Sequence, residues 1–182
     1  MTVATILRSR TRREHVRTEA IYAHFDLQDR DGYARFLIAQ ASASLAVEQS
    51  LERAGVTDVV GDWAERRRAH LLSDDLSALN VEGVRLQPTP SFGSSAEIMG
   101  AVYVLEGSRL GGKILRKRVF DTAPMRFLGA EARPGAWKDL LASLNLGLRD
   151  QQDIQSAVAA ARGVFATFET AGREAAEICV EH

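Results

Sequence analysis

The sequence is poor in several residue types, and each shortage excludes a class of protein. The 182 residues include a single cysteine, Cys179, so neither a disulfide framework nor a thiolate metal cluster can form within one chain. The longest apolar run, IMGAVYVL, is far shorter than the roughly 20 residues that a membrane span requires. The formal net charge is -1, and no clustering of aromatic with basic residues marks a nucleic-acid surface. We therefore expect a soluble protein that binds neither membranes nor nucleic acids.

The length and the opening residues bear on organisation and location. A chain of this size, with 46% hydrophobic and 26% charged residues, is expected to form one domain over residues 1–182. The start, MTVATILRSRTRREH, carries charges where a signal peptide would need an apolar stretch. Together with the sparing use of cysteine, this favours the cytoplasm.

Strand-forming patterns are also scarce, and their absence favours helices. The sequence has four prolines, no Asn-Gly hairpin signal and no sustained alternation of apolar and polar residues. The spacing of apolar residues predicts helices over residues 3–24, 31–55, 62–79, 94–120, 134–147 and 150–179, with a loop over 80–93. Ser94 and Glu97 have the spacing of a capping box at the start of the fourth helix. The predicted fold class is therefore all-α, in a single domain.

The predicted helix over 94–120 contains an unusual number of glycines. Gly100, Gly107, Gly111 and Gly112 lie in its interior, where each costs about 1 kcal/mol relative to alanine. The spacing places the first three near one face of the helix. Two explanations remain open, a close crossing by another helix or a flat ligand against bare backbone, and the tandem pair also favours a local kink. The KILRKR stretch that follows complements the helix dipole, which favours a solvated end over a phosphate site.

One of the four histidines is distinguished by its place in the predicted first helix. Leu7, Thr11, Thr18 and Tyr22 share one face of this helix by their spacing. Between Thr11 and Thr18, the same face includes either Glu14 or His15. A histidine on such a face is commonly a core side chain with its polar atoms satisfied. The pattern alone leaves His15 either a structural residue or a ligand.

The neighbours of His15 favour the second interpretation. Glu19 lies one turn further on, close enough to orient a ring nitrogen directly or through water. Arg8 and Arg12 precede His15 on nearly the same face. An imidazole with an orienting carboxylate and flanking cations suits an iron-bound ligand that carries carboxylates.

Three stretches follow one another in the order found in a known family. They are LRSRTRREHVRTE near the N-terminus, FDLQDRDGYARFLIAQASASLAVEQSLERAG after it, and YVLEGSRLGGKIL in the middle. Together they resemble the haem oxygenases, most nearly the bacterial branch found beside bacteriophytochromes. The resemblance covers most of the chain and implies a haem oxygenase-like helical bundle.

The resemblance implies roles for four residues of the first helix. His15 matches the proximal histidine, which is the protein ligand to haem iron and part of the catalytic site. Glu19 matches an acid close to that histidine. Arg8 and Arg12 match basic residues that can meet the haem propionates.

The remaining implied residues lie on two later helices. Gly107, Gly111 and Gly112 match the glycines of the distal helix, which crosses close above the haem, and the first two count with the catalytic residues. Phe165 resembles an aromatic residue of the haem pocket. Ser108 stands where animal members carry an aspartate that organises distal water, so a serine without charge takes that catalytic position.

The implied reaction is cleavage of haem to biliverdin, carbon monoxide and ferrous iron. Haem is both cofactor and substrate, and the reaction uses O2 and an external reductant. The implied partners are an electron-donor reductase or ferredoxin and, as recipient of biliverdin, a bacteriophytochrome. The basic surface around KILRKR and Arg8 is a candidate docking site for an acidic reductase, although ordinary solvated charge explains it equally well.

Three other functions remain open at this point. A haem-binding protein for storage or delivery would keep His15 and the basic residues but would not turn haem over. A different enzyme could use the same helical architecture. An interaction module could pack its glycine-bearing helix on a partner.

Overall fold

A computed structural model describes residues 2–178, and the regular elements of this part of the chain are all helices, as predicted. The helices are α1 (Val3–Arg10), α2 (Arg12–Tyr22), α3 (Arg30–Arg53), α4 (Val56–Val59), α5 (Trp63–Arg66), α6 (Ala69–Ala78), α7 (Ser95–Leu115), the 3-10 turn η1 (Arg116–Arg118), α8 (Arg126–Gly129), α9 (Ala136–Gly147) and α10 (Gln151–Ala176). Cys179 lies outside the described residues. Within residues 2–178, no helix is both long and apolar enough to cross a bilayer.

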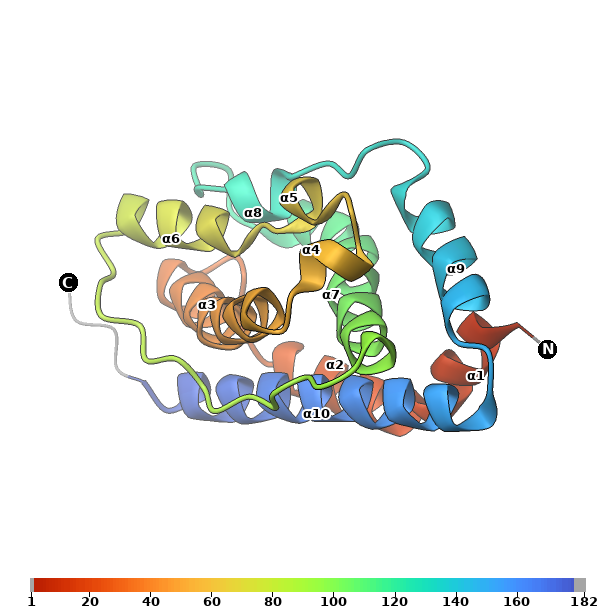
Figure 1. The fold of residues 1–182 in the computed structure, drawn as a ribbon. Helices are drawn as coiled ribbons and strands as arrows, with labels where there is room; N and C mark the ends of the chain where they lie inside the picture. Colours follow the sequence, from red (N-terminus) through yellow and green to blue (C-terminus); the bar gives the residue numbers. More distant parts are fainter. Residues whose placement is uncertain (1, 179–182) are drawn as a thin grey trace.

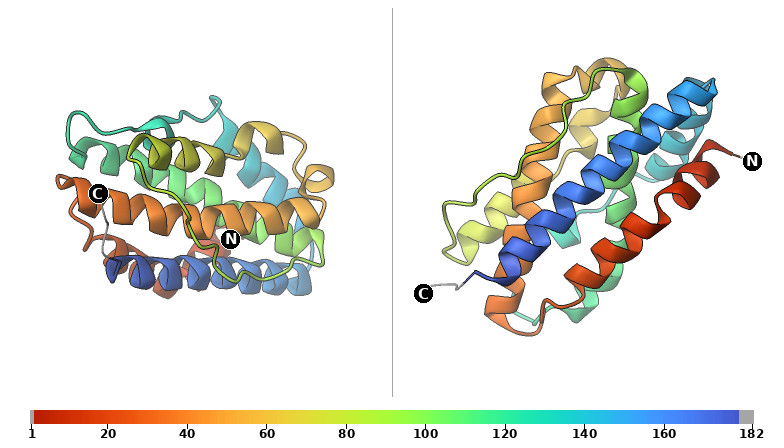
Figure 2. Two further views of the ribbon diagram at one scale, coloured as in Figure 1. Left: turned by 90° about the vertical axis from the view of Figure 1, so that its left-hand side faces the viewer. Right: turned by 90° about the horizontal axis from the view of Figure 1, so that it is seen from below.

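The longest helix, α10, organises the bundle. It packs against α7, α3, α2 and α1. Figure 1 shows α10 and α2 along one side, α3 and α7 above them, and α6 and α8 beyond. The two turned views in Figure 2 show α1 and α2 running beside α10. The helix pair α2 and α7, which carries most of the predicted site residues, thus shares α10 as a packing partner.

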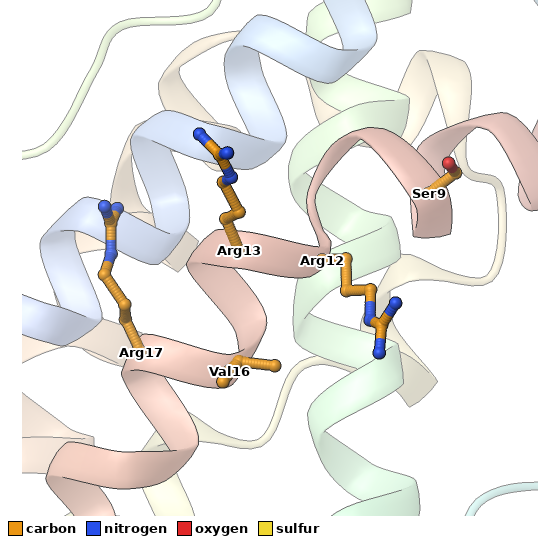
Figure 3. A pocket seen from close by; sticks show the side chains of 5 residues that line it. All are labelled: Ser9, Arg12, Arg13, Val16 and Arg17. Atoms are coloured by element: carbon orange, nitrogen blue, oxygen red, sulfur yellow. The ribbon is translucent and has the colours of Figure 1, made fainter.

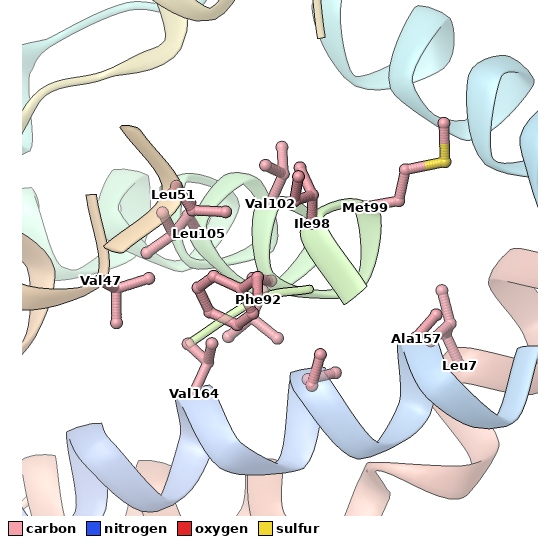
Figure 4. Packing of buried hydrophobic residues seen from close by; sticks show 14 of the residues in the cluster. Leu7, Val47, Leu51, Phe92, Ile98, Met99, Val102, Leu105, Ala157 and Val164 are labelled. Carbon is pink, nitrogen blue, oxygen red and sulfur yellow. The ribbon is translucent and has the colours of Figure 1, made fainter. Parts of the chain in front are cut away.

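The core between α7 and α10 consists of small and branched side chains. Leu7 from α1, Val102 from α7 and the pair Ala157 and Val164 from α10 are fully buried in it. Figure 4 shows these side chains converging between the helices. Burial of each branched aliphatic side chain contributes about 1.5–3 kcal/mol, so this cluster fixes the angle at which α7 crosses α10. A second cluster lies under α3 and α6, where Phe36 is 1% exposed.

The segment over residues 80–93 crosses from α6 to α7 as an extended loop, as predicted. Ser50 of α3 anchors it by donating a hydrogen bond to the Pro90 carbonyl at 2.7 Å. The capping box is confirmed in part: the Glu97 amide donates to Ser94 Oγ, but the Glu97 carboxylate accepts from the amide of Gly93, one residue before the N-cap, at 2.6 Å. The first bond satisfies an amide that α7 would otherwise leave unpaired at its start, and the second holds the turn before the helix.

The single helix predicted over 3–24 is wrong, because the chain breaks at Thr11 into α1 and α2. The Thr11 hydroxyl donates to the Leu7 carbonyl at 2.8 Å, a back-bonding arrangement that bends helices. The Arg10 carbonyl accepts two hydrogen bonds from the guanidinium of Arg162 on α10. A contact from a helix more than a hundred residues away therefore sets a break that the local residue types conceal.

The helix predicted over 62–79 is also wrong, since it divides into α5 and α6 with Arg67 extended between them. Glu48 of α3 is the cause. Its Oε1 accepts hydrogen bonds from the amides of Arg68 and Ala69 at 2.9 and 3.0 Å and so caps the start of α6. The short helices α4 and α8 have no counterpart among the predicted helices.

Candidate functional site on α2 and α7

His15 lies on α2, and two neighbouring side chains restrain its ring. Nδ1 is 3.4 Å from Oε2 of Glu19, one turn further along α2. The ring packs edge-on against Phe165 of α10, with centroids 5.9 Å apart and planes at 83°. The side chain nevertheless remains 56% exposed. Because the contact with Glu19 uses Nδ1, a metal would take Nε2 of a ring that is already oriented.

Of the two alternatives for the apolar phase of the first helix, the one that passes His15 is wrong. None of the residues of α2 is buried. The phase passes Glu14 instead, whose side chain is 16% exposed against 56% for His15. A core histidine is thereby excluded as the explanation of His15.

The flank of α2 that carries Glu14 binds α10 through charged side chains. Glu14 pairs with Arg162 at 3.4 Å, and Arg17 pairs with Glu169 at 3.1 Å. Arg162 also holds the end of α1 through the Arg10 carbonyl. These contacts fix the rotation of α2 about its axis and so determine where His15 points.

The two predicted propionate-binding residues lie on α1 and α2 and are both exposed. Burial raises the pKa of Tyr103 on α7, and the positive charge of nearby Arg8 acts against this rise. Arg12 borders a surface hollow of about 570 Å³ together with Ser9, Arg13, Val16 and Arg17. Figure 3 shows Arg13 and Arg17 extending toward α10 and Arg12 extending to the other side. The hollow therefore shares only Arg12 with the predicted site.

The glycines of α7 have different surroundings. A Cβ atom at Gly100 would overlap the backbone of Ala157 on α10, so this glycine permits a close helix crossing. A Cβ at Gly107 would meet only Trp137, at 3.9 Å, and one at Gly111 would meet nothing within 4 Å. At Gly112 the nearest atom is Leu128 Cδ2 at 3.6 Å, an ordinary contact.

The open side of α7 extends beyond its glycines. Leu110 and Ile114 are 49% and 69% exposed, and their spacing from Gly107 and Gly111 places all four on one stripe. The helix continues without interruption through Gly111 and Gly112 to Leu115, so the tandem pair does not end it. The result is an exposed apolar stripe with two bare backbone positions, where an added Cβ atom would meet little or nothing.

Sequence reasoning missed two aromatic residues at the end of this stripe. Tyr103 lies one turn before Gly107, and its ring is 5.6 Å from that of Trp137 on α9. Trp137 is also the nearest neighbour of Gly107, while Arg8 approaches Tyr103 from α1. The spacing of Tyr103 from Gly107 was the only available signal, because Trp137 arrives from a distant part of the chain.

Ser108 is exposed at the edge of this stripe, and its hydroxyl is bonded to Arg68, the residue that precedes α6. Its hydroxyl donates to the Leu105 carbonyl at 2.7 Å and accepts a hydrogen bond of 2.8 Å from Nη2 of Arg68. Arg68 belongs to the RRR run before His70, and its burial was not foreseen: only 8% of it is exposed. Ser108 is thus anchored by a buried cation from the segment between α5 and α6.

Buried charges hold the same side of α7. Glu106 pairs with Arg66 at 3.1 Å and with Arg109 at 3.3 Å, and all three are less than a tenth exposed. Arg109 also donates to the Arg66 carbonyl at 2.6 Å. Removing one partner of such a buried pair leaves an uncompensated charge, so this network holds the residues around Gly107 firmly in place.

The pKa values around this network follow from burial and from the neighbouring charges. Burial, followed by the nearby Arg109, lowers the pKa of Arg68 to about 10, which still leaves the side chain protonated at neutral pH. Burial also raises the pKa of Glu48, against the pull of the amides that it caps. The hydrogen bond from Arg66 is the main reason that the pKa of Asp62 lies below its usual value.

Solved structures of two bacterial proteins have the same fold. The nitric oxide- and carbon monoxide-bound haem oxygenase of Neisseria meningitidis is 21% identical, with a TM-score of 0.79 over 100% of this chain and 96% of its own. The haem oxygenase of Leptospira interrogans is 22% identical, with a TM-score of 0.74 over 96% of this chain and 100% of its own. The prediction of an all-α, haem oxygenase-like domain is confirmed by these matches.

Sequence comparison reaches further than the fold. No family model matches the chain. A protein of Xanthomonas campestris pv. campestris named heme oxygenase is 31% identical over 148 residues, which cover 78% of this chain and 89% of that protein. At this identity and coverage, the chain belongs to the haem oxygenase family.

Proposed function

We propose that this protein is an active haem oxygenase. It binds haem between α2 and α7 and, with O2 and electrons from an external reductant, converts it to biliverdin, carbon monoxide and ferrous iron. Membership of the family supports this proposal. The observation that carries it is the pairing of an oriented, accessible imidazole at His15 with an open stripe on α7 at Gly107 and Gly111.

The residues present fit the shape and charge of haem. The bare backbone at Gly107 and Gly111 leaves room that side chains would fill, and the exposed Leu110 and Ile114 supply apolar contact. Haem propionates require cations at the edge of such a site. Arg8 on α1 and Arg12 on α2, the helix that carries His15, are both exposed, and we propose them as the partners of the propionates.

The proximal residues hold and orient the iron ligand. His15 supplies Nε2, while Glu19 at Nδ1 favours the tautomer that leaves Nε2 free of a proton. Phe165 limits rotation of the ring through its edge contact. A histidine ligand gives less electronic push than a thiolate, which suits a reaction directed at the porphyrin rather than at a second substrate.

The distal residues shape the space in which oxygen is used. Bound haem supplies the redox chemistry and the activation of oxygen, while the chain supplies orientation and hydration. Gly107 and Gly111 let the backbone approach the ligand closely. Ser108, with no charge of its own, takes the position at which water would be organised, and we retain it with Gly107 and Gly111 among the proposed catalytic residues. Gly112 contributes close approach next to them.

A hemin assay tests the proposal directly. Hemin is added to the purified protein, followed by a reductant under air, and loss of the haem band is followed together with growth of bilin absorption. A stable haem complex that forms no bilin would identify a storage or delivery protein instead. Absence of any hemin-induced band would favour an unrelated enzyme or an interaction module.

The iron ligand is tested with a matched pair of variants. His15→Ala should abolish the ligation signature in the haem spectrum. His24→Ala, just beyond the end of α2, should leave it unchanged, because Glu19 and Phe165 orient the ring of His15, whereas Nδ1 of His24 is 2.7 Å from the Ala20 carbonyl. If His24→Ala abolished the ligation signature and His15→Ala did not, His24 would be the iron ligand.

The finer assignments remain part of this proposal. We propose a reductase or ferredoxin as electron donor, a bacteriophytochrome as recipient of biliverdin, and a place in the bacteriophytochrome-associated branch. A cytoplasmic location and a domain over residues 1–182 stay predictions. Co-purification of the product with a bacteriophytochrome apoprotein, followed by the appearance of its red absorption, would test the recipient.

A further inference from the structure

We propose that Arg68 is a positioning residue of the distal helix, which acts through the hydroxyl of Ser108. This inference rests on the proposed haem oxygenase function for its chemical consequence, but the mechanical part can be tested without haem. It assigns a role to the second buried arginine of the RRR run.

The Arg68 side chain is built into the protein rather than laid on its surface. The guanidinium donates to Ser108 Oγ at 2.8 Å and to the Leu105 carbonyl at 3.4 Å, so both bonds end on α7. Its other face lies over the ring of Phe127, 4.4 Å from the centroid. A planar, delocalised cation can use its edge for hydrogen bonds and its face for an aromatic ring at the same time, which an ammonium group cannot do.

The backbone of Arg68 is also fixed, from a third helix. Glu48 of α3 accepts hydrogen bonds from the amides of Arg68 and Ala69. The extended Arg67 separates α5 from α6 and lets Arg66 and Arg68 both turn inward. Arg68 therefore connects α3 to α7 through a chain of contacts that has little freedom to move.

This arrangement determines what the Ser108 hydroxyl can offer to the site. A hydroxyl has one proton to donate and two lone pairs to accept. The proton goes to the Leu105 carbonyl at 2.7 Å, and one lone pair accepts from Arg68. What remains is a single lone pair, so Ser108 acts toward a distal water as an acceptor and not as a donor.

The same contact restrains α7 mechanically. Arg68 holds Leu105 and Ser108, while Arg66 and Arg109 hold Glu106 between them. The bonds at Glu106 and Arg109 lie across α7 from the exposed stripe at Gly111, whereas those at Ser108 lie at the edge of this stripe. They oppose rotation of a segment that, at Gly107 and Gly111, has no side chains to lock it in place.

The first experiment measures hydrogen exchange of the haem-free protein over residues 105–115. Arg68→Met keeps an apolar stem over Phe127 but cannot donate to Ser108, and Ser108→Ala removes the acceptor at an exposed helix position. Both variants should exchange faster in this segment, by about tenfold, if one charge-assisted hydrogen bond restrains it. Arg67→Met is the matched control, since Arg67 is exposed and pairs with Glu52 at the surface.

The second experiment uses the carbon monoxide complex of the reduced, haem-loaded protein. The stretching band of carbon monoxide responds to nearby dipoles, so Arg68→Met and Ser108→Ala should both shift it. The double variant should shift it no further than either single variant, because the two residues act as one unit. Arg68→Lys should restore the band only in part, and Arg67→Met should leave it unmoved.

The two experiments separate the failure of this inference from the failure of the proposed function. If the unaltered protein shows no hemin band, the proposed function and the role of Ser108 toward a distal water are both rejected. Hydrogen exchange then still tests whether Arg68 restrains α7. If hemin binds and Arg68→Met matches Arg67→Met in both measurements, the role of Arg68 is overturned and the oxygenase proposal stands. Additive band shifts in the double variant would overturn the action through Ser108.

Discussion

The first and second halves of α7 both carry glycine, and the surroundings of these glycines differ completely. Gly100 lies where the backbones of α7 and α10 cross, with no space for a Cβ atom. Gly111 lies on an exposed stripe with no neighbour within 4 Å of a Cβ. The helix crossing requires glycine at position 100, whereas the packing around Gly111 would also admit a side chain.

This difference shows what spacing can and cannot reveal about glycine in helices. Gly100, Gly107 and Gly111 share a face by their numbers alone, and a helix crossing and a ligand site both predict that pattern. The structure assigns the crossing to Gly100 and leaves Gly107 and Gly111 unexplained by protein contacts. Each glycine costs about 1 kcal/mol relative to alanine. For the second half, the proposed haem site would offset that cost.

The largest expected effect is on stability, at the crossing. Gly100→Ala would force the backbones of α7 and α10 apart, because the obstacle is the Ala157 carbonyl rather than a flexible side chain. Overpacking of this kind costs about 3 kcal/mol. In a chain of this size, that lowers the melting temperature by roughly 6–12 °C, which differential scanning calorimetry of the haem-free protein measures. An unchanged melting temperature would show that the helices do not meet at Gly100.

A smaller and opposite effect on stability is expected at the open stripe. Gly111→Ala should raise the free energy of unfolding by up to about 1 kcal/mol, because alanine favours the helix and the added methyl group meets no atom. If the stripe is a haem site, the same variant should weaken hemin binding or slow bilin formation. Urea denaturation and a hemin titration on one preparation measure both. Higher stability with unchanged haem behaviour would remove Gly111 from the site.

The sequence predicted the parts of this molecule that depend on neighbouring residues. The start of α7 follows from Ser94 and Glu97, which cap the helix locally. The last helix was predicted over 150–179 and is observed over Gln151–Ala176, where Asp150 accepts from the Asp153 amide. The family-specific spacing around His15 and Gly107 likewise lies within short motifs.

The parts that the sequence did not predict depend on contacts between distant residues. Arg66 reaches Glu106 and Arg68 reaches Ser108, each across 40 positions, and no local pattern distinguishes these buried arginines from solvated ones. The break at Thr11 involves Arg162, which bonds the Arg10 carbonyl across 152 positions. Such contacts are decided by the packing of the whole bundle, so the charged side of α7 became visible only in the structure.

The smallest expected effect concerns the charge of Glu48, behind the second half of α7. Burial raises the pKa of this carboxyl, so between its ordinary value of about 4.3 and the raised value the folded state binds more protons than the unfolded state. The free energy of unfolding therefore falls as the pH rises through that interval. Glu48→Gln removes the titration but keeps both caps, because the amides of Arg68 and Ala69 share the single acceptor Oε1.

Denaturation at pH values from 4 to 8 should accordingly show a flatter profile for Glu48→Gln than for the unaltered protein, with a change below about 1 kcal/mol. Glu52→Gln is the control, since Glu52 lies one turn further along α3 and pairs with Arg67 at the surface, with 42% of its side chain exposed. Parallel profiles for Glu48→Gln and the unaltered protein would show that Glu48 holds Arg68 through hydrogen bonds alone. The second half of α7 would then be fixed by the geometry of its buried arginines, without a contribution from the carboxylate charge behind them.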